Sequence, residues 1–332
     1  MATIYDVAKN AGVSIATVSR VFNDSERVSQ RTLAKVREAA VELGYTPNLA
    51  ARSLMIKRTD TIGVVLPDIH GEFFSELVRG IDSTARREGL HMLVSSSHDN
   101  KEDMVAALSS MKGRVDGIVI MSPLIDVKTL GKYISDDVPV VVVNGNNEEK
   151  RFPRVSVDNF GGAYQMTQYL IEQEYRNICV IGGPSNNNDA EQRRHGCLRA
   201  LEESPEGPTL DFVSGHFTEE SGYKAGKNIL AQDQLPDAIF ALNDDMAIGC
   251  LSALDEAGLS IPKDVAIAGF DDIPLSRCMR PSLTTVHTHI YELGERAVEV
   301  LLERSNSDVS HDADPEHIVE ASLVIRASTS QC

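Results

Sequence analysis

The chain has 332 residues, 42% of them hydrophobic, which is enough for a small domain and one or two larger units with cores of their own. The absence of any run of about 18 apolar residues argues against a membrane-spanning helix, and the N-terminus lacks the basic and then apolar stretches of a secretory signal. The five cysteines are scattered without a CxxC pair, so reduced thiols in a cytoplasmic protein are expected.

The net charge of −17 is unevenly distributed along the chain. Residues 1–59 contain nine Lys and Arg against five Asp and Glu, a net charge of +4, which leaves −21 for residues 60–332. A basic segment attached to an acidic one is typical of a protein that presents one end to DNA and repels DNA elsewhere. The charge distribution therefore favours a nucleic-acid partner for the N-terminal segment.

Three short helices are predicted before residue 46. Thr3-Ile4-Tyr5-Asp6 forms a variant of the capping box, in which the Thr3 hydroxyl accepts from the third amide and the Asp6 carboxylate reaches back. This first helix ends at Gly12, and Ser14 and Ser29 cap the second and third helices. The residues at helical spacing that form their inner faces are Val7, Ala8, Ala11, Val18, Val21, Phe22, Leu33, Val36 and Ala40. A turn of about four residues between the first two helices predicts a helix-turn-helix.

From residue 61 onwards, short apolar runs alternate with amphipathic stretches, which predicts parallel sheets covered by helices. The expected strands are 62–66, 92–94, 118–121, 138–143, 178–181, 239–242 and 265–268. The amphipathic stretches include 73–88, 101–112, 164–174, 192–203, 221–231 and 246–257. A segment of about 270 residues is large for one open sheet, so two lobes are expected, with a ligand in the cleft beyond the carboxyl ends of their strands.

Several strings resemble the lactose/galactose repressor (LacI/GalR) family of transcription regulators. They begin with TIYDVAKNAGVSIATVSRVFN, VREAAVELGYTPNLAARSL and KRTDTIGVVLPD. They continue through VDGIVI, VSVDNFGGAY, FALNDDMAIG, VAIAGFDDIP, PSLTTVH and LVIRASTS. The resemblance implies an N-terminal all-α helix-turn-helix headpiece and a two-lobed α/β periplasmic-binding-protein-like (type I) domain with parallel sheets.

The resemblance also implies domain boundaries. The expected divisions are a DNA-binding headpiece at 1–46, a hinge helix and linker at 47–60, and an effector-binding and dimerisation domain at 61–332. Within that domain, the N-lobe is expected at about 61–159 and 290–319, and the C-lobe at about 160–289 and 320–332. The hinge segment favours a helix but is too short to be stable alone.

Segment 15–23 matches the recognition helix of the family. Arg20 stands where the family faces base edges and can donate a bidentate pair to guanine, worth roughly 1–3 kcal/mol of discrimination. As an isolated residue, Arg20 would instead be a solvated surface charge. Leu54 matches a leucine that the family inserts into a base step from the minor groove, which kinks the DNA. The DNA-binding residues implied by the resemblance are Thr3, Ile15, Ala16, Thr17, Ser19, Arg20, Asn23, Leu54 and Met55.

The family binds its effector at cleft-facing strand ends and helix starts. The matching positions are Phe73, Phe74, Asn144, Asp189, Arg193, Phe217, Asn243 and Asp271. Carboxylates, amides and a guanidinium can pair with vicinal hydroxyls, and an aromatic ring can stack on the C–H face of a sugar. Arg193 and Asp271 are the main candidates, and Arg194 is the alternative to Arg193. Phe73 could instead belong to the hydrophobic core. Asp189 is expected in a polar loop.

Other features predict neither a cofactor nor an enzyme. His287 and His289 share a strand face, but no third ligand is evident, so no metal site is expected. The turn at 181–184 lacks the GxGxxG-plus-acid pattern of a dinucleotide site, and 305–316 reads as a polar, acidic loop. No GxSxG elbow or P-loop occurs.

The sequence thus predicts a cytoplasmic, nucleoid-associated transcription regulator, a repressor, that binds a near-palindromic operator as a homodimer. Its operator affinity would be modulated by a sugar or sugar derivative, with an α-glucoside or maltose-type sugar as one candidate. A dimer is expected because Cys332 leaves no room for the leucine-repeat helix of the family's tetramers. A periplasmic sugar-binding protein and a sugar-metabolising enzyme are the alternatives. The effector, the direction of the response, the operator and regulation by a carrier protein stay open.

Overall fold

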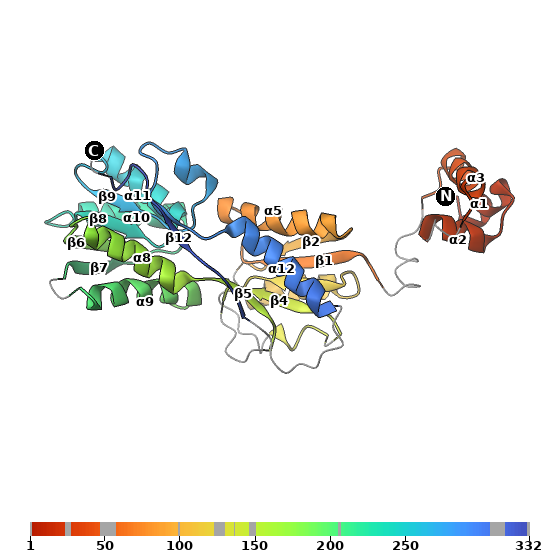
Figure 1. Cartoon of the computed structure of the whole chain (residues 1–332), viewed down its shortest axis with the longest axis horizontal. Helices are drawn as coiled ribbons and strands as arrows, with labels where there is room; N and C mark the ends of the chain where they lie inside the picture. The colour runs from red at the N-terminus through yellow and green to blue at the C-terminus, as the bar shows by residue number, and fades with distance from the viewer. Residues whose placement is uncertain are drawn as a thin grey trace. The chain divides into compact units, whose positions relative to one another are not determined.

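The computed structural model describes residues 2–23, 28–46, 58–98, 100–122, 130–135, 137–145, 151–204, 207–305 and 316–330. The chain divides into two compact units, Met1–Thr59 and Asp60–Cys332 (Figure 1). Most of the expected hinge segment at 47–60, including Leu54 and Met55, lies outside the described residues. Over the described ranges, no helix is both long and apolar enough to cross a membrane.

The N-terminal unit consists of three helices, and its helix-turn-helix arrangement is as predicted. They are α1 (Ile4–Ala11), α2 (Ile15–Asn23) and α3 (Gln30–Glu42). The capping box before α1 is confirmed, since the Thr3 hydroxyl accepts from the amide of Asp6 while Asp6 Oδ2 accepts from the amide of Thr3 at 2.9 Å. Val7, Val18 and Val36 are fully buried at the centre of the small core.

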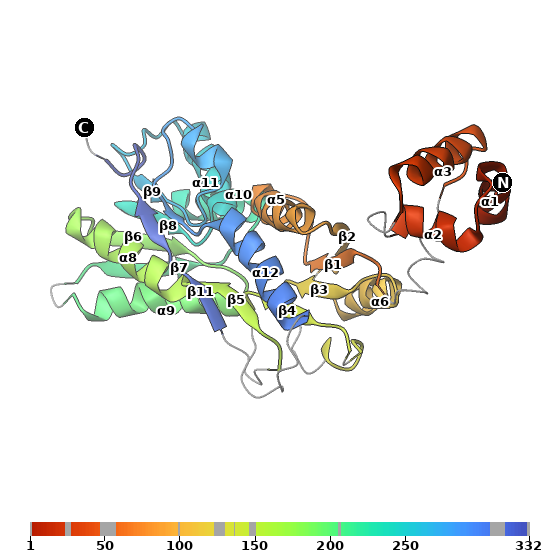
Figure 2. The ribbon, with the colours of Figure 1, turned by 45° about the vertical axis from the view of Figure 1, so that its right-hand side comes forward.

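The first lobe of the C-terminal unit is built on a six-stranded parallel sheet with the order β11-β5-β4-β3-β1-β2. Its strands are β1 (Thr61–Leu66), β2 (His91–Ser96), β3 (Gly117–Ile120), β4 (Val140–Val143), β5 (Arg154–Val157) and β11 (Glu316–Val319). Its helices are α5 (Glu72–Arg87), α6 (Lys101–Met111) and α12 (Ile290–Ser305). Helices α5 and α12 lie side by side (Figure 2), and a Cβ atom at Gly80 would clash with the carbonyl oxygen of Tyr291 at their contact.

The second lobe has a four-stranded parallel sheet with the order β7-β6-β8-β9. Its strands are β6 (Asn177–Ile181), β7 (Thr209–Val213), β8 (Ala238–Ala241) and β9 (Ala266–Ala268). Its helices are α8 (Asn159–Glu172), α9 (Asn188–Glu202), α10 (Glu219–Leu230), α11 (Asp244–Glu256) and the 3₁₀ helix η2 (Pro274–Arg277). An antiparallel pair, β10 (Thr285–His287) and β12 (Ser322–Val324), completes the described elements.

The chain passes between the lobes at three places within the described residues: after β5, after β10 and after β11. Neither lobe is therefore a continuous segment. The cores of both sheets follow from their buried aliphatic strands, because β3, β4 and β8 are buried at every position.

The structure differs from the sequence-based expectations at several elements. Strands β5, β7, β11 and β12 were not expected, because polar residues interrupt their sequences. The strand expected to carry both His287 and His289 ends at His287 as β10, so His289 lies beyond it. Helix α8 begins at Asn159, earlier than the expected start near residue 164. Gly162 in its first turns packs closely against Val286, since a Cβ atom at Gly162 would lie 2.9 Å from that side chain. The expected loop around Asp189 is wrong, since the side chain of Asn187 caps α9 and Asp189 lies in its first turn. Glu316, expected in an acidic loop, begins β11; residues 306–315 lie outside the described ranges.

Candidate functional site

A cavity of about 400 Å³ lies between the two lobes of the C-terminal unit. Its walls are segments that follow the carboxyl ends of strands in both sheets, the usual place for a ligand in this class of fold. The cavity brings together all eight residues expected to bind an effector: Phe73, Phe74, Asn144, Asp189, Arg193, Phe217, Asn243 and Asp271.

Arg193 of α9 is held on three sides at the buried end of the cavity. Its Nε donates to Oδ1 of Asn159 at 2.8 Å, and its Nη1 donates to the carbonyl oxygen of Leu242. Its Nη2 lies 3.0 Å from Oδ1 of Asp271, and both side chains of this ion pair are 6% exposed. The guanidinium carbon stands 3.8 Å from the ring centroid of Phe270, a cation–π contact.

Arg194, the alternative to Arg193, is exposed and does not line the cavity. Its guanidinium carbon lies 5.1 Å from the ring centroid of Phe212, beside a separate pocket. Of the two arginines, Arg193 is the one that lines the cavity.

Two buried carboxylates, Asp189 and Asp271, line the same cavity as Arg193. Burial raises the pKa of Asp271 to about 7, although Arg193 acts in the opposite direction. Burial also raises the pKa of Asp189, with Arg193 again opposing it. Oδ1 of Asp271 accepts no well-aligned hydrogen bond from the described residues despite its closeness to Arg193. A buried acceptor in this state can be satisfied by a donor on a ligand.

Aromatic rings form the apolar part of the wall. Phe73 and Phe74, in the first turn of α5, meet edge to face with centroids 5.4 Å apart. Phe73, for which a core position was the alternative, is half-buried and faces the cavity. The ring of Phe217 packs on Gly183, where a Cβ atom would lie 2.5 Å from Cζ of that ring.

The two asparagines of the predicted set form hydrogen bonds inside the protein. Oδ1 of Asn243 accepts from the amide of Met246 at 3.0 Å as the N-cap of α11, and its Nδ2 donates to the carbonyl of Phe217 at 3.1 Å. Oδ1 of Asn144 accepts from the amide of Val157 at 3.1 Å. Both asparagines therefore use at least one polar side-chain atom to hold the backbone of the cavity wall in place.

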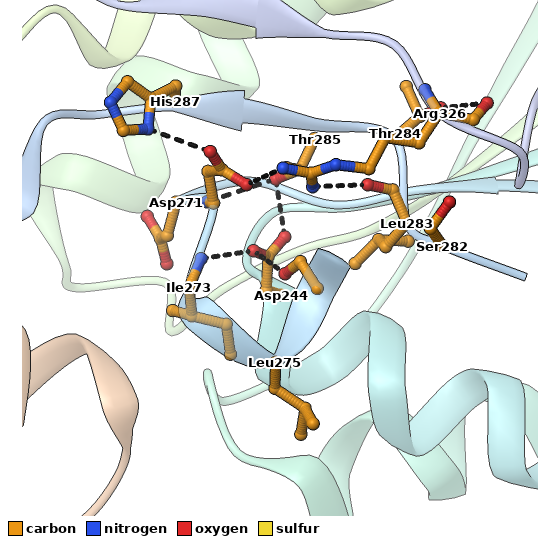
Figure 3. A network of polar contacts seen from close by, with 12 residues as sticks. Asp244, Asp271, Ile273, Leu275, Ser282, Leu283, Thr284, Thr285, His287 and Arg326 are labelled. Carbon is orange, nitrogen blue, oxygen red and sulfur yellow. Dashed lines mark hydrogen bonds and ion pairs between the residues drawn. The ribbon is translucent and has the colours of Figure 1, made fainter. Parts of the chain in front are cut away.

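Sequence reasoning missed Asp244, which organises the loop that carries Asp271. The Asp244 carboxylate accepts from the amide of Ile273 at 3.0 Å and from the hydroxyls of Ser276 and Thr285, each at 2.6 Å (Figure 3). Burial, with Asp271 nearby, raises the pKa of Asp244 to about 8. The NDD string at 243–245 was the available signal, but only its asparagine matched a family position.

The adjacent Asp272 also belongs to this network. It lies 2.6 Å from Nη2 of Arg326 and 2.9 Å from Nδ1 of His287. The rings of His287 and His289 have centroids 4.2 Å apart. Within the part of the chain that the structure describes, no group of three or more His, Cys, Asp or Glu side chains is arranged to hold a metal ion.

Further cavity residues were missed because they have no distinctive spacing in the sequence. Asn159, the first residue of α8, does not line the cavity but orients Arg193, which does. The missed lining residues with polar side chains are Asp68, His70, Asn187, His216, Thr218, Glu219, Glu220 and Asp245.

In the N-terminal unit, α2 presents one face outwards. Ile15, Ala16 and Arg20 are exposed, with Ile15 at 40%, whereas Thr17 and Ser19 are half-buried. Val18 and Val21 are buried on the opposite face. Thr3 belongs to the capping box of α1, and the side chain of Asn23 lies outside the described residues.

Comparison with known proteins identifies both units. Residues 3–48 match the model of bacterial regulatory proteins of the lacI family, and residues 167–329 match a periplasmic binding protein-like domain. The HTH-type transcriptional repressor PurR of Pasteurella multocida (strain Pm70) is 37% identical over 331 residues, covering 99% of this chain and 98% of the relative.

Solved structures agree over the whole length. The Lac repressor dimer bound to operator and the anti-inducer ONPF superposes with a TM-score of 0.88 at 29% identity and 99% coverage of both chains. The CelR–cellobiose complex, a transcriptional regulator, gives 0.73 at 28% identity, covering 99% of this chain and 100% of its own. The Pasteurella multocida relative is a transcriptional repressor by name. With a helix-turn-helix unit and a two-lobed, periplasmic-binding-protein-like unit, the chain belongs to the lacI family of bacterial regulatory proteins.

Proposed function

We propose that the protein is a homodimeric repressor that binds a near-palindromic operator and releases or tightens on it when a sugar or sugar derivative occupies the cavity. The observation that carries this proposal is the cavity itself, because all eight expected effector residues line one space of about 400 Å³. That volume suits a mono- or disaccharide-sized ligand. An α-glucoside or maltose-type sugar is one candidate, and the CelR–cellobiose complex supports a carbohydrate.

The cavity suits a switch because its walls come from both lobes. A ligand that contacts Phe73 on one lobe and Arg193 on the other would bind the closed arrangement more tightly than an open one. Such a difference in affinity is the only route by which a ligand can shift the protein between two states. The same coupling, read in the opposite direction, makes operator DNA change the affinity for the effector.

The DNA-binding part of the proposal rests on α2. Its exposed face offers Arg20 for a base edge and the apolar side chains of Ile15 and Ala16 for neighbouring bases, while Thr17 and Ser19 are suited to phosphate contacts. Two copies of this helix would read half-sites about one helical turn apart. The Lac repressor dimer on its operator supports this arrangement.

Selection of bound sequences from random duplex DNA, followed by titration at several salt concentrations, tests this reading. Arg20→Ala is expected to weaken selected sites at least tenfold more than random DNA, because the arginine reads a base edge. Arg37→Ala, an equal charge change on the exposed side of α3, serves as the control and should weaken both alike. If Arg20→Ala lowers the affinity for selected sites and for random DNA equally, Arg20 does not read a base edge.

Effector binding and assembly need separate measurements. A thermal-shift screen of mono- and disaccharides should find a ligand that stabilises the fold by about 2.7 kcal/mol at 100 times its dissociation constant. The same ligand should change operator affinity in a titration, and the sign of that change identifies induction or co-repression.

Light scattering at micromolar concentration should report a dimer, and a monomer or tetramer would contradict the proposed assembly.

A further inference from the structure

Two of the hydrogen-bonding side chains that line the cavity, Arg193 and Asn243, have their nitrogens engaged within the protein. Each of the three nitrogens of Arg193 already has a partner, in Asn159, Leu242 and Asp271. The side-chain nitrogen of Asn243 donates to the carbonyl of Phe217. Neither of these two side chains therefore offers a ligand a nitrogen that lacks a partner in the protein.

The charge of the lining points the same way. Among the described residues that line the cavity, Arg193 is the only Lys or Arg, and its charge is paired with Asp271. Six carboxylates line the same cavity: Asp68, Asp189, Glu219, Glu220, Asp245 and Asp271. A phosphate or carboxylate on a ligand would meet this excess of negative charge without a cation to receive it.

The buried charged residues of the cavity are two carboxylates, Asp189 and Asp271, and a single cation, Arg193. Asp189 and Arg193 stand four residues apart on α9, and Asp271 pairs with the same guanidinium, so two buried carboxylates share one cation. Asp189 receives only a long hydrogen bond, 3.4 Å, from the amide of Gly145 among the described residues. Since a buried charge is costly without a partner, the cavity is built to accept a further cation that also donates hydrogen bonds.

A third carboxylate and the aromatic walls reinforce this preference. Asp245 is half-buried at the start of α11, and its Oδ2 lies 3.6 Å from where a Cβ atom of Gly71 would be, on the opposite side of the cleft. Burial raises the pKa of Asp245, and the neighbouring Glu219 and Glu72 raise it further by like-charge repulsion, which a bound cation would relieve. The rings of Phe73, Phe74 and Phe217 can attract a cation through their faces.

We propose that the cavity selects a sugar derivative bearing a protonated amine over its neutral and phosphorylated counterparts, with the ammonium group held between Asp189 and Asp271. This inference rests on the proposed function, namely that the cavity holds the effector. It adds the charge of that effector and the two carboxylates that recognise it.

The test is a thermal-shift and calorimetric comparison of matched ligands on the full-length protein: D-glucosamine, D-glucose and D-glucose 6-phosphate, and the corresponding galactose series. The amine of at least one series should bind at least tenfold more tightly than its neutral form, and the phosphate should not bind. A neutral or phosphorylated sugar that binds more tightly than its amine, or amines that give no shift, would overturn the proposal.

Variants separate recognition of the charge from general damage. Asp189→Asn keeps the shape of the side chain and should reduce amine affinity at least tenfold, because one of the two carboxylates is neutralised. Glu202→Gln is the control, since Glu202 lies at the other end of α9 from Asp189, is exposed and does not line the cavity, and amine affinity should not change. Unchanged amine binding in Asp189→Asn would also overturn the assignment; if that variant does not fold, the comparison of ligands on the natural protein decides alone.

The outcome distinguishes this inference from the proposed function. Neutral sugars that bind and alter operator affinity would leave the regulator intact and reject the ammonium site. If no sugar of any charge binds while operator binding persists, the proposed sugar effector fails together with the ammonium site.

Discussion

The side-chain nitrogen of Asn243 donates a hydrogen bond of 3.1 Å to the backbone carbonyl of Phe217, while its oxygen caps α11. Phe217 has a φ of 60°, a left-handed conformation that costs a non-glycine residue free energy and needs support from its surroundings. One amide thus fixes both a helix start and the backbone that presents an aromatic ring to the cavity.

Asn243→Asp should therefore weaken effector binding more than it weakens the fold. Aspartate is as good an N-cap as asparagine, so the cap persists, but the donor to Phe217 is lost. We expect a tenfold or greater loss of effector affinity with little change in melting temperature, whereas Asn243→Ala should also lower the melting temperature.

A fluorescence measurement can follow the ring directly. The natural chain contains no tryptophan, so Phe217→Trp supplies a single indole at the cavity. Its emission should shift when Asn243→Asp is added. An unchanged spectrum together with unchanged effector affinity would show that Asn243 does not position Phe217.

Gly183→Ala should impair the cavity while Gly182→Ala should not. A Cβ atom at Gly183 would lie 2.5 Å from the Phe217 ring and 2.7 Å from Ala190, so the ring must move. The nearest atom to a Cβ at Gly182 is the carbonyl oxygen of Val213 at 3.5 Å, an ordinary contact. Calorimetric titration of the effector on both variants checks this, and equal affinities would refute the packing argument.

Arg193→Ala should destabilise the C-terminal unit by about 3–5 kcal/mol, because Asp271 would be left buried without its cation. Arg194→Ala is the matched control, since that side chain is exposed, and its effect should stay within about 0.5 kcal/mol. Urea denaturation followed by circular dichroism measures both. A loss below about 1 kcal/mol for Arg193→Ala would contradict the importance of the pair.

The free energy of unfolding should fall as the pH rises from about 4 to about 8. Burial raises the pKa of Asp271 to about 7 and of Asp244 to about 8, so in this window the folded chain binds more protons than the unfolded chain, whose Asp groups titrate near 4. The slope from each carboxyl is at most about 1.4 kcal/mol per pH unit.

The variant Asp244→Asn isolates one of these groups. It should flatten the pH dependence of the melting temperature, and it should lower that temperature at pH 6, because an amide cannot accept all three hydrogen bonds made to Asp244. A melting temperature that rises between pH 6 and 8 in the natural protein, or an unaltered slope in the variant, would contradict the assignment.

Periodicity and capping residues predict those parts of the fold that local physics controls. The capping box at Thr3 and the helix-turn-helix after it are confirmed, as are the buried strands β3, β4 and β8, since continuous aliphatic runs leave few other structures. Strand β7 escaped prediction because it lies at a sheet edge, where polar residues such as Asp211 are tolerated.

The candidate site was predictable in its members but not in its connections. Family positions brought eight residues forward, and all of them line one cavity. The sequence could not reveal that Asn159, at the start of α8, orients Arg193, because that contact joins residues 34 apart in different helices. Nor could the sequence show that the side-chain nitrogen of Asn243 donates a hydrogen bond to Phe217, since that contact depends on the tertiary structure.

The edge strand β11 has a consequence for biosynthesis. Residues 316–319 pair with β5 in the sheet whose first strand, β1, begins at Thr61. The strand that completes this sheet is therefore synthesised about 250 residues after β1. Arg154 of β5 bonds to Glu316 of β11 and to the carbonyl of Gly145, whose amide reaches Asp189 in the cavity. On the ribosome, a headpiece of local helices can fold early, but the cavity between the lobes gains its full support only when translation is nearly complete. Until then, the N-terminal unit can be folded while the first lobe still lacks its edge strand.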